Sequence, residues 1–225
     1  MTVTAKPIIL YSNSSCPYVQ RALIALYECD LDHEAVEIPL PNKPDWYLEL
    51  NPEGKVPALK YGDDILVESL VIAEFFSDLA GGKLLPKDPL KKAQARYLIE
   101  FFGAKFLPLY YSILGNTDTE KAKLLEQQFV ENLKRLNKLL SAQSTEGPFY
   151  FGEEFSLVEA AVAPFLSRFT PMAKIGGIQI PKIPELQRYH QWSDAVGQRE
   201  SFIKSSLSSQ ELYESCEALA LKYRG

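Results

Sequence analysis

The chain has 225 residues, of which 46% are hydrophobic and 24% charged, so it is long enough for one large or two small globular domains. Its net charge of -5 and its lack of a basic stretch argue against a nucleic-acid surface and against a polybasic membrane patch. No run approaches the length of a membrane span, and residues 1–7 lack the apolar core of a signal peptide. We therefore expect a cytoplasmic protein.

Cysteine and histidine are scarce. The 3 cysteines are widely spaced and cannot form a disulfide framework, which fits a reducing compartment. The 2 histidines, His33 and His190, show no Cys/His ligand spacing. We therefore expect neither a metal site nor a histidine-based catalytic dyad.

The first predicted elements are a short buried strand, residues 8–11, and an amphipathic helix over residues 19–29, with Ser14-Ser15-Cys16-Pro17 between them. Pro17 fits a first helical turn, where its missing N–H is not needed. A cysteine there is close to unpaired backbone N–H groups and to the positive end of the helix dipole, which favour the thiolate. The sequence thus predicts a nucleophilic Cys16. The alternative is a buried, inert cysteine, the commoner fate of a lone one, although this polar, turn-like context favours reactivity.

No second thiol accompanies Cys16. Dithiol oxidoreductases carry Cys-x-x-Cys, whereas Val19 occupies the fourth position here. Cys29 and Cys216 lie at the end of one helical stretch and inside another, and we expect both to be inert. The implied chemistry is that of a single thiol, and an external thiol must complete the cycle.

Further strands and helices complete the N-terminal pattern. Alternation over residues 33–38 predicts a second strand, parallel to the first. A proline-rich loop, a short helix over residues 45–51 and a hairpin around Gly62-Asp63 follow. Ser69 is a natural N-cap for the next helix, whose apolar residues recur at helical spacing up to Leu79. The order β-α-β-α-β-β-α describes a thioredoxin-like domain.

The rest of the chain is helical in pattern. We predict a C-terminal bundle of about five helices, the first of them bent or interrupted at Pro108, and a central apolar helix headed by the capping box Ser156-x-x-Glu159. The expected fold class is α/β plus all-α. The expected division is a thioredoxin-like domain at 1–82, a linker at 83–89 and an all-helical domain at 90–225.

Four motifs, in this order and spacing, carry a resemblance that spans the whole chain: Cys16-Pro17-Tyr18, the segment 42–47, Val56-Pro57-Ala58-Leu59 and Glu68-Ser69. Together they resemble a cysteine-type glutathione transferase. The omega class is most similar and the lambda class is a near alternative. The helical half and its capping box also have counterparts in that superfamily.

The resemblance implies a glutathione site at seven positions: Cys16, Tyr18, Lys43, Val56, Pro57, Glu68 and Ser69. Glu68 and Ser69 resemble the pair that holds the γ-glutamyl end, and the physics agrees, because a helix N-terminus suits a carboxylate and a glutamate suits an ammonium group. Val56 matches the residue whose backbone pairs with the cysteinyl unit, and Pro57 resembles the family's cis-proline. Lys43 matches the lysine that reaches the glycyl carboxylate. Without the resemblance, Lys43 reads as a solvated charge and Ser69 as an ordinary cap.

Two residues depart from the family pattern. Tyr18 replaces the phenylalanine usual in the omega motif, so we expect its hydroxyl near the sulfur of Cys16. Glu159 replaces the usual aspartate of the capping box, which adds one methylene to a buried turn.

The resemblance implies a glutathione-dependent thiol transferase or reductase with Cys16 as catalytic residue, glutathione as co-substrate, no metal, and weak conjugation of electrophiles. Its second substrate, a glutathionylated or hydrophobic aromatic small molecule, is expected between the domains, at Tyr110, Tyr111, Phe165, Arg168 and Phe169. The alternative is a non-catalytic carrier of aromatic ligands, of the ligandin type. A structural or regulatory role on the same fold is less favoured, because the whole glutathione-site set is present. A homodimer is expected by resemblance only.

Overall fold

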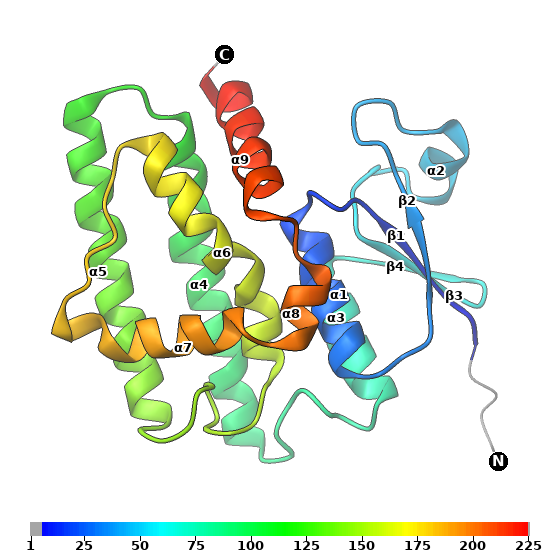
Figure 1. Cartoon of the computed structure of the whole chain (residues 1–225). Coiled ribbons are helices and arrows are strands. Elements are labelled where there is room, and N and C mark those ends of the chain that lie inside the picture. The colour runs from blue at the N-terminus through cyan, green and yellow to red at the C-terminus, as the bar shows by residue number, and fades with distance from the viewer. Residues whose placement is uncertain (1–5, 225) are drawn as a thin grey trace.

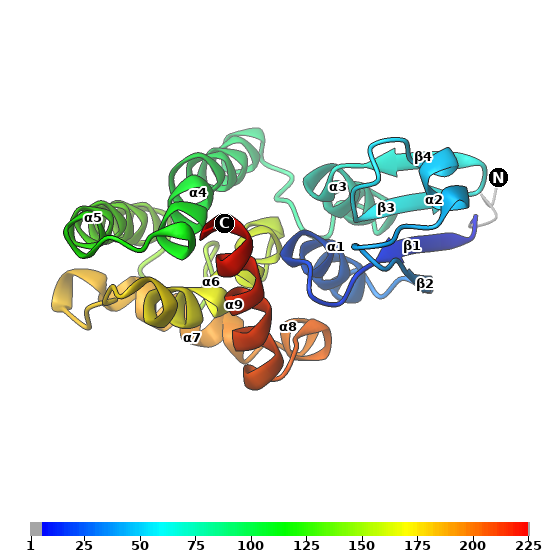
Figure 2. The same cartoon turned by 90° about the horizontal axis from the view of Figure 1, so that it is seen from above.

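The structure is a computed structural model, and it describes residues 6–224. A four-stranded mixed sheet forms its N-terminal part, with the strand order β2-β1-β3-β4 (Figures 1 and 2). Strand β1 pairs in parallel with β2 and antiparallel with β3, and β4 is antiparallel to β3. The strands are β1 (Ile8–Ser12), β2 (Glu34–Glu37), β3 (Ala58–Tyr61) and β4 (Asp64–Val67).

Side chains of β1 alternate between the two faces of the sheet, as a pleated strand requires. Leu10 joins the main core, beneath helices α1 (Pro17–Glu28) and α3 (Ser69–Leu79), which pack against each other. Tyr11 joins a smaller cluster that contains Tyr47 of the short helix α2 (Asp45–Leu50). The predicted order β-α-β-α-β-β-α is therefore confirmed. Figure 1 shows α1 and α3 between the sheet and the helical half of the molecule.

One predicted detail of this part is wrong. Ser69 is the first residue of α3 rather than its N-cap, and the N-cap position is held by Glu68, whose φ is 71°. That left-handed conformation is uncommon outside glycine and marks a constrained backbone at this point.

The C-terminal half is built from helices only. The long α4 contacts α5, α6 and α9, and α6 is the central helix, since its contacts extend to α1, α3, α7 and α9. The helical elements are α4 (Pro89–Gly115), α5 (Thr119–Gln143), α6 (Leu157–Gly176), the 3-10 turn η1 (Pro184–Leu186), α7 (Gln187–Gly197), α8 (Glu200–Ser205) and α9 (Ser209–Arg224).

The capping box at the start of α6 forms as predicted. The Ser156 hydroxyl accepts a hydrogen bond from Val158 N at 3.2 Å, while the Glu159 carboxylate accepts one from Ser156 N at 2.9 Å. The carboxylate also accepts from Tyr150 N and Trp192 Nε1, at 2.7 and 2.8 Å, in a fully buried setting. Glu159 therefore ties the loop before α6 and helix α7 to the start of the central helix.

Helix α4 is not interrupted at Pro108, because both Pro108 and Ala104, whose carbonyl loses its partner, lie on the exposed side of the helix. A bend at Pro108 stays a prediction. The number of helices needs correction. The region from residue 90 to residue 224 contains six α-helices rather than about five. The missed one is α8, whose six residues are too few to show an apolar period.

The exact limits of the two domains and of the linker at 83–89 stay a prediction.

Among residues 6–224, no helix combines the length and apolarity that crossing a membrane requires.

Candidate active site at Cys16

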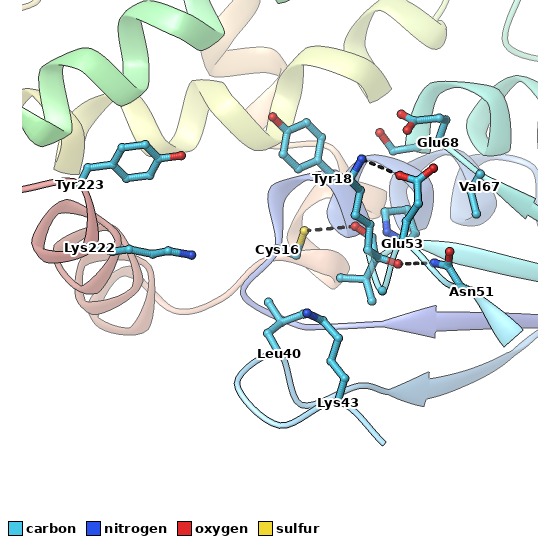
Figure 3. A pocket seen from close by; sticks show the side chains of 15 residues that line it. Cys16, Tyr18, Leu40, Lys43, Asn51, Glu53, Val67, Glu68, Lys222 and Tyr223 are labelled. Atoms are coloured by element: carbon cyan, nitrogen blue, oxygen red, sulfur yellow. Dashed lines mark hydrogen bonds and ion pairs between the residues drawn. The ribbon is translucent and has the colours of Figure 1, made fainter. Parts of the chain in front are cut away.

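A pocket of about 770 Å³ lies between the sheet and helix α9. Figure 3 shows Cys16 on one side of it and Lys222 and Tyr223 of α9 on the opposite side. All seven residues of the predicted glutathione site line the pocket. They are Cys16, Tyr18, Lys43, Val56, Pro57, Glu68 and Ser69. The structure therefore brings together residues that are separated by up to 53 positions in the sequence, from Cys16 to Ser69.

The loop between β1 and α1 fixes the position of Cys16. Asn13 organises this loop: its side-chain oxygen accepts from Ser15 N at 3.2 Å, its amide donates to Ile38 O at 3.1 Å, and its backbone carbonyl accepts from Cys16 N at 3.0 Å. Cys16 has extended backbone angles and occupies the N-cap of α1, with Pro17 as the first helical residue. The sulfur thus lies at the start of the helix, as the sequence predicts.

Two kinds of effect act on the pKa of the Cys16 thiol in opposite directions. Burial raises the pKa of the Cys16 thiol, whereas the backbone N–H groups of Val19 and Tyr18 and the guanidinium of Arg168 lower it. The raising effect is the larger. The thiol donates a long hydrogen bond, 3.8 Å, to Val56 O. The N–H groups at the helix start therefore favour the thiolate, as the sequence predicts, but desolvation outweighs them, so the pKa of Cys16 is raised in the ligand-free protein.

The direction of this shift sets the pH dependence of Cys16 reactivity. Since the thiolate is the nucleophile and the pKa is raised in the folded state, we expect alkylation of Cys16 to accelerate with rising pH through a midpoint above that of the denatured chain. The raised pKa of Cys16 also makes the free energy of unfolding depend on pH. Its contribution to stability is fully present below the ordinary thiol pKa and is lost as pH rises through the folded-state pKa. Iodoacetamide labelling, quenched at intervals and mapped by mass spectrometry, measures the midpoint. A midpoint below the denatured reference contradicts the assigned direction.

The loop before β3 presents the backbone of Val56 to the pocket. The Asn51 amide and the Tyr47 hydroxyl both donate to Lys55 O, at 2.8 and 2.5 Å. These two hydrogen bonds fix the loop just before Val56. The Val56-Pro57 peptide bond is cis, as the resemblance implies. Val56 is thereby fixed opposite Cys16.

At the other end of the pocket, the start of α3 places Glu68 and Ser69 side by side. Glu68 is exposed, while Ser69 is 5% exposed and its hydroxyl accepts from Arg21 Nη1 at 3.0 Å. Arg21 lies buried behind it, with Nε bonded to Ala161 O at 2.8 Å, and burial lowers its pKa to about 10. Because the Ser69 oxygen accepts the hydrogen bond from Arg21, the hydroxyl hydrogen of Ser69 remains available to donate to a ligand.

A second buried arginine supports the Cys16 loop. Arg168 of α6 donates to Ser15 O at 3.1 Å and to Gln20 Oε1 at 2.8 Å. Sequence reasoning missed Arg21 altogether and placed Arg168 in a substrate site. The one sequence signal for these roles is an arginine among the apolar residues of a helix, because a charge that is buried there needs hydrogen-bond partners.

Several residues that line the pocket were also missed. Gly54 has φ 62°, and a Cβ there would come within 3.3 Å of the Lys43 side chain, so a glycine lets Lys43 lie across the loop. Lys222 and Tyr223 come from the last helix, whose return to the N-terminal part has no local sequence signal. The missed lining residues are Leu40, Asn51, Glu53, Gly54, Lys55, Val67, Lys222 and Tyr223.

Two aromatic residues, Tyr18 and Tyr223, line the pocket, and Tyr111 of α4 contacts both of them. The Tyr18 hydroxyl pairs with the Tyr111 hydroxyl at 3.2 Å. The expected approach of the Tyr18 hydroxyl to the sulfur stays a prediction. Tyr111 is half-buried and stacks on Tyr223 with ring centroids 5.2 Å apart. Burial raises the pKa of Tyr111, so its hydroxyl stays protonated.

The rest of the predicted hydrophobic substrate site is core. Tyr110, Phe165 and Phe169 are at most 1% exposed, Arg168 is 3% exposed, and none of them lines the pocket. The prediction is wrong for these four residues, because an aromatic stripe at helical spacing looks the same on a core face and on a cleft. Tyr111 stays a prediction. Within residues 6–224, no group of three or more His, Cys, Asp or Glu side chains is arranged to hold a metal.

A thioredoxin-like domain with a cysteine at its first helix, followed by a helical domain, is the architecture of glutathione transferases. Residues 10–84 match the description "Glutathione S-transferase, N-terminal domain", and residues 116–195 match "Glutathione S-transferase, C-terminal domain". The chain belongs to the glutathione S-transferase family.

Individual relatives agree with the omega and lambda resemblance. Glutathione S-transferase omega-1 of Sus scrofa is 27% identical over 196 residues, which cover 81% of this chain and 80% of that protein. Glutathione S-transferase L3 of Arabidopsis thaliana is 29% identical over 210 residues, or 91% and 84% of the two chains. Glutathione transferase Omega 2C of Trametes versicolor superposes with a TM-score of 0.79 at 30% identity, over 96% and 99%.

Proposed function

We propose that this protein is a glutathione-dependent thiol transferase that removes glutathione from mixed disulfides through Cys16. The observation that carries the proposal is the half-buried Cys16 thiol at a helix start, on the wall of a pocket that contains the whole predicted glutathione set. A serine or tyrosine at that position would leave glutathione's own thiolate to attack electrophiles. A cysteine favours disulfide exchange instead.

Glutathione is held along the length of the pocket in this proposal. The Ser69 hydroxyl and the N–H groups at the start of α3 bind its γ-glutamyl carboxylate, and Glu68 binds the adjacent ammonium group. The backbone of Val56 pairs with the cysteinyl unit, which brings the ligand sulfur toward Cys16. Lys43 binds the glycyl carboxylate.

The reaction is two successive thiol–disulfide exchanges. The Cys16 thiolate attacks the glutathione sulfur of a glutathionylated substrate, a Cys16–glutathione disulfide forms, and the substrate leaves as a thiolate that takes up a proton. The thiolate of a second glutathione then attacks the bound glutathione sulfur. Oxidised glutathione leaves, and Cys16 is a thiolate again.

The spacing of the cysteines supports a requirement for that second glutathione. Cys29 follows α1 at its far end and Cys216 lies buried on α9, so neither is among the pocket residues. No pocket cysteine of the described chain is therefore available to resolve the mixed disulfide internally.

Two assays run side by side test the function. We expect the protein with reduced glutathione to release a peptide thiol from a glutathionylated peptide, and to conjugate glutathione to an aryl halide much more slowly. Rapid conjugation without peptide release would reverse the assignment.

The ligandin alternative is favoured by the half-exposed Tyr223 ring stacked on Tyr111, and displacement of a fluorescent dye by aromatic compounds tests it. A cytoplasmic location and a homodimer stay predictions.

A further inference from the structure

The last turn of helix α9 brings two side chains to the wall of the pocket that lies opposite Cys16. Lys222 and Tyr223 both line the pocket, and Figure 3 shows their side chains pointing into it from that side. All seven residues of the predicted glutathione site come from the N-terminal part of the chain, up to Ser69. With glutathione in its proposed place, the wall formed by α9 is therefore the one that meets the second substrate.

The end of α9 is anchored, so the position from which Lys222 projects is defined. Arg224 Nε donates to Leu114 O of α4, and Arg224 Nη2 donates to Ile175 O of α6, both at 3.1 Å. The ring of Tyr223 stacks on the half-buried tyrosine of α4, with ring centroids 5.2 Å apart. These contacts fix the backbone on the C-terminal side of Lys222.

The charged residues that line the pocket can be assigned one by one. Lys55 and Glu53 form an ion pair with an N–O distance of 2.7 Å, which is drawn in Figure 3. Lys43 and Glu68 bind charged groups of glutathione in the proposed function. Lys222 is the only other charged residue of the described lining, and no ion pair recorded within residues 6–224 involves it. One ammonium group opposite Cys16 thus lacks a counter-charge.

The direction of Lys222 and its missing counter-charge together indicate an anionic partner. A lysine in the last turn of a helix also interacts favourably with the helix dipole, so its place in α9 alone defines no role. Opposite charges attract more strongly in a pocket than in bulk water, because fewer water molecules screen them. A carboxylate beside the disulfide of a substrate would pair with Lys222 while the disulfide lies at Cys16.

We propose that Lys222 selects the second substrate, and that this substrate is a glutathionylated thiol flanked by carboxylate groups, as in an acidic peptide segment. The proposal rests on the thiol transferase function, since it concerns the acceptor side of the same pocket. The exchange itself is the one described above, in which Cys16 attacks the glutathione sulfur and the substrate leaves as a thiolate that takes up a proton. Lys222 binds the carboxylate and takes no part in bond formation.

Three glutathionylated peptides that differ only in the residues beside the cysteine, which are glutamate, glutamine or lysine, test this selection. We expect kcat/KM of the wild type to be about fivefold higher for the glutamate peptide than for the glutamine peptide, as for one partly exposed ion pair. K222M should bring this ratio to about one, K222E should reverse the preference toward the lysine peptide, and K222R should retain it. Lys138 is exposed on α5 and outside the pocket, so K138M removes the same charge and should keep the wild-type ratio.

Alkylation of Cys16 tests the charge of the α9 wall without any turnover. Iodoacetate is an anion and iodoacetamide is neutral, so the ratio of their rates at Cys16 reports the charge that faces the sulfur. We expect K222M to lower the iodoacetate-to-iodoacetamide ratio about threefold and K138M to leave it unchanged. Lys222 is exposed, so its replacement leaves the core intact, and thermal melting establishes that each variant is folded.

Failure of the two proposals gives different results. Release of thiol from none of the peptides by the wild type overturns the thiol transferase function and the selection with it. Release from all three peptides at one rate overturns only the selection by Lys222, as does an acidic preference or an alkylation ratio that is unchanged in K222M. Weaker glutathione binding by K222M in calorimetry, with the peptide preference unchanged, also overturns it and assigns the lysine to a glutathione carboxylate.

Discussion

Replacing Cys16 by serine is expected to reduce the release of thiol from a glutathionylated peptide by at least about a hundredfold, because a serine hydroxyl is not ionised near neutral pH and cannot form the mixed disulfide. The affinity of the Cys16→Ser variant for glutathione should change little, because the proposed binding contacts are made by Glu68, Ser69 and the Val56 backbone. Steady-state turnover gives the first quantity. Calorimetric titration with glutathione gives the second.

Cys29→Ala is the matched control for Cys16→Ser. Cys29 is a buried thiol at the other end of the same helix and does not line the pocket. Turnover by this variant should equal that of the wild type. Undiminished peptide release by Cys16→Ser, or a comparable loss in Cys29→Ala, is incompatible with a mechanism through Cys16.

Substitution of Glu159 is expected to have the largest effect on stability. One carboxylate oxygen accepts from Tyr150 N and Trp192 Nε1, and the other accepts from the nitrogen and the hydroxyl of Ser156, at 2.6 to 2.9 Å. Glu159→Gln turns one oxygen into an amide that faces two donors. Each orphaned buried donor costs about 1–3 kcal/mol, so we expect the free energy of unfolding to fall by about 3 kcal/mol.

Urea unfolding followed by circular dichroism measures this loss. The exposed neighbour Glu154 provides the control, because Glu154→Gln should change the unfolding free energy by less than about 0.5 kcal/mol. Trp192→Phe removes the indole donor while keeping an aromatic ring, and we expect it to be less damaging than Glu159→Gln. A glutamine variant as stable as the wild type would mean that the four bonds do not hold the start of α6.

Much of the fold was predictable because its boundaries carry local chemistry. Pro17 starts α1, Gly62 turns the hairpin, and Ser156 with Glu159 starts α6. Prediction was limited where the local rule had a competitor. Pro108 is tolerated because its turn faces solvent, and α8 is too short for a periodic pattern.

The seven residues of the predicted glutathione site came from the family resemblance, because by itself Lys43 reads as a solvated charge and Ser69 as an ordinary cap. The hydrophobic site was not predictable, because Phe165 and Phe169 have the same spacing whether they line a cleft or fill a core. Tertiary effects were also invisible. The return of α9, which brings Tyr223 to the pocket, has no local signal, and neither does the burial that raises the Cys16 pKa.

The most direct test is the mass of the intact protein after exposure to oxidised glutathione, followed by peptide mapping of the adduct. A thiol held at the pocket wall should take up one glutathionyl group, located on Cys16 and removed again by reduced glutathione. No adduct, or an adduct confined to Cys29 or Cys216, would contradict the account.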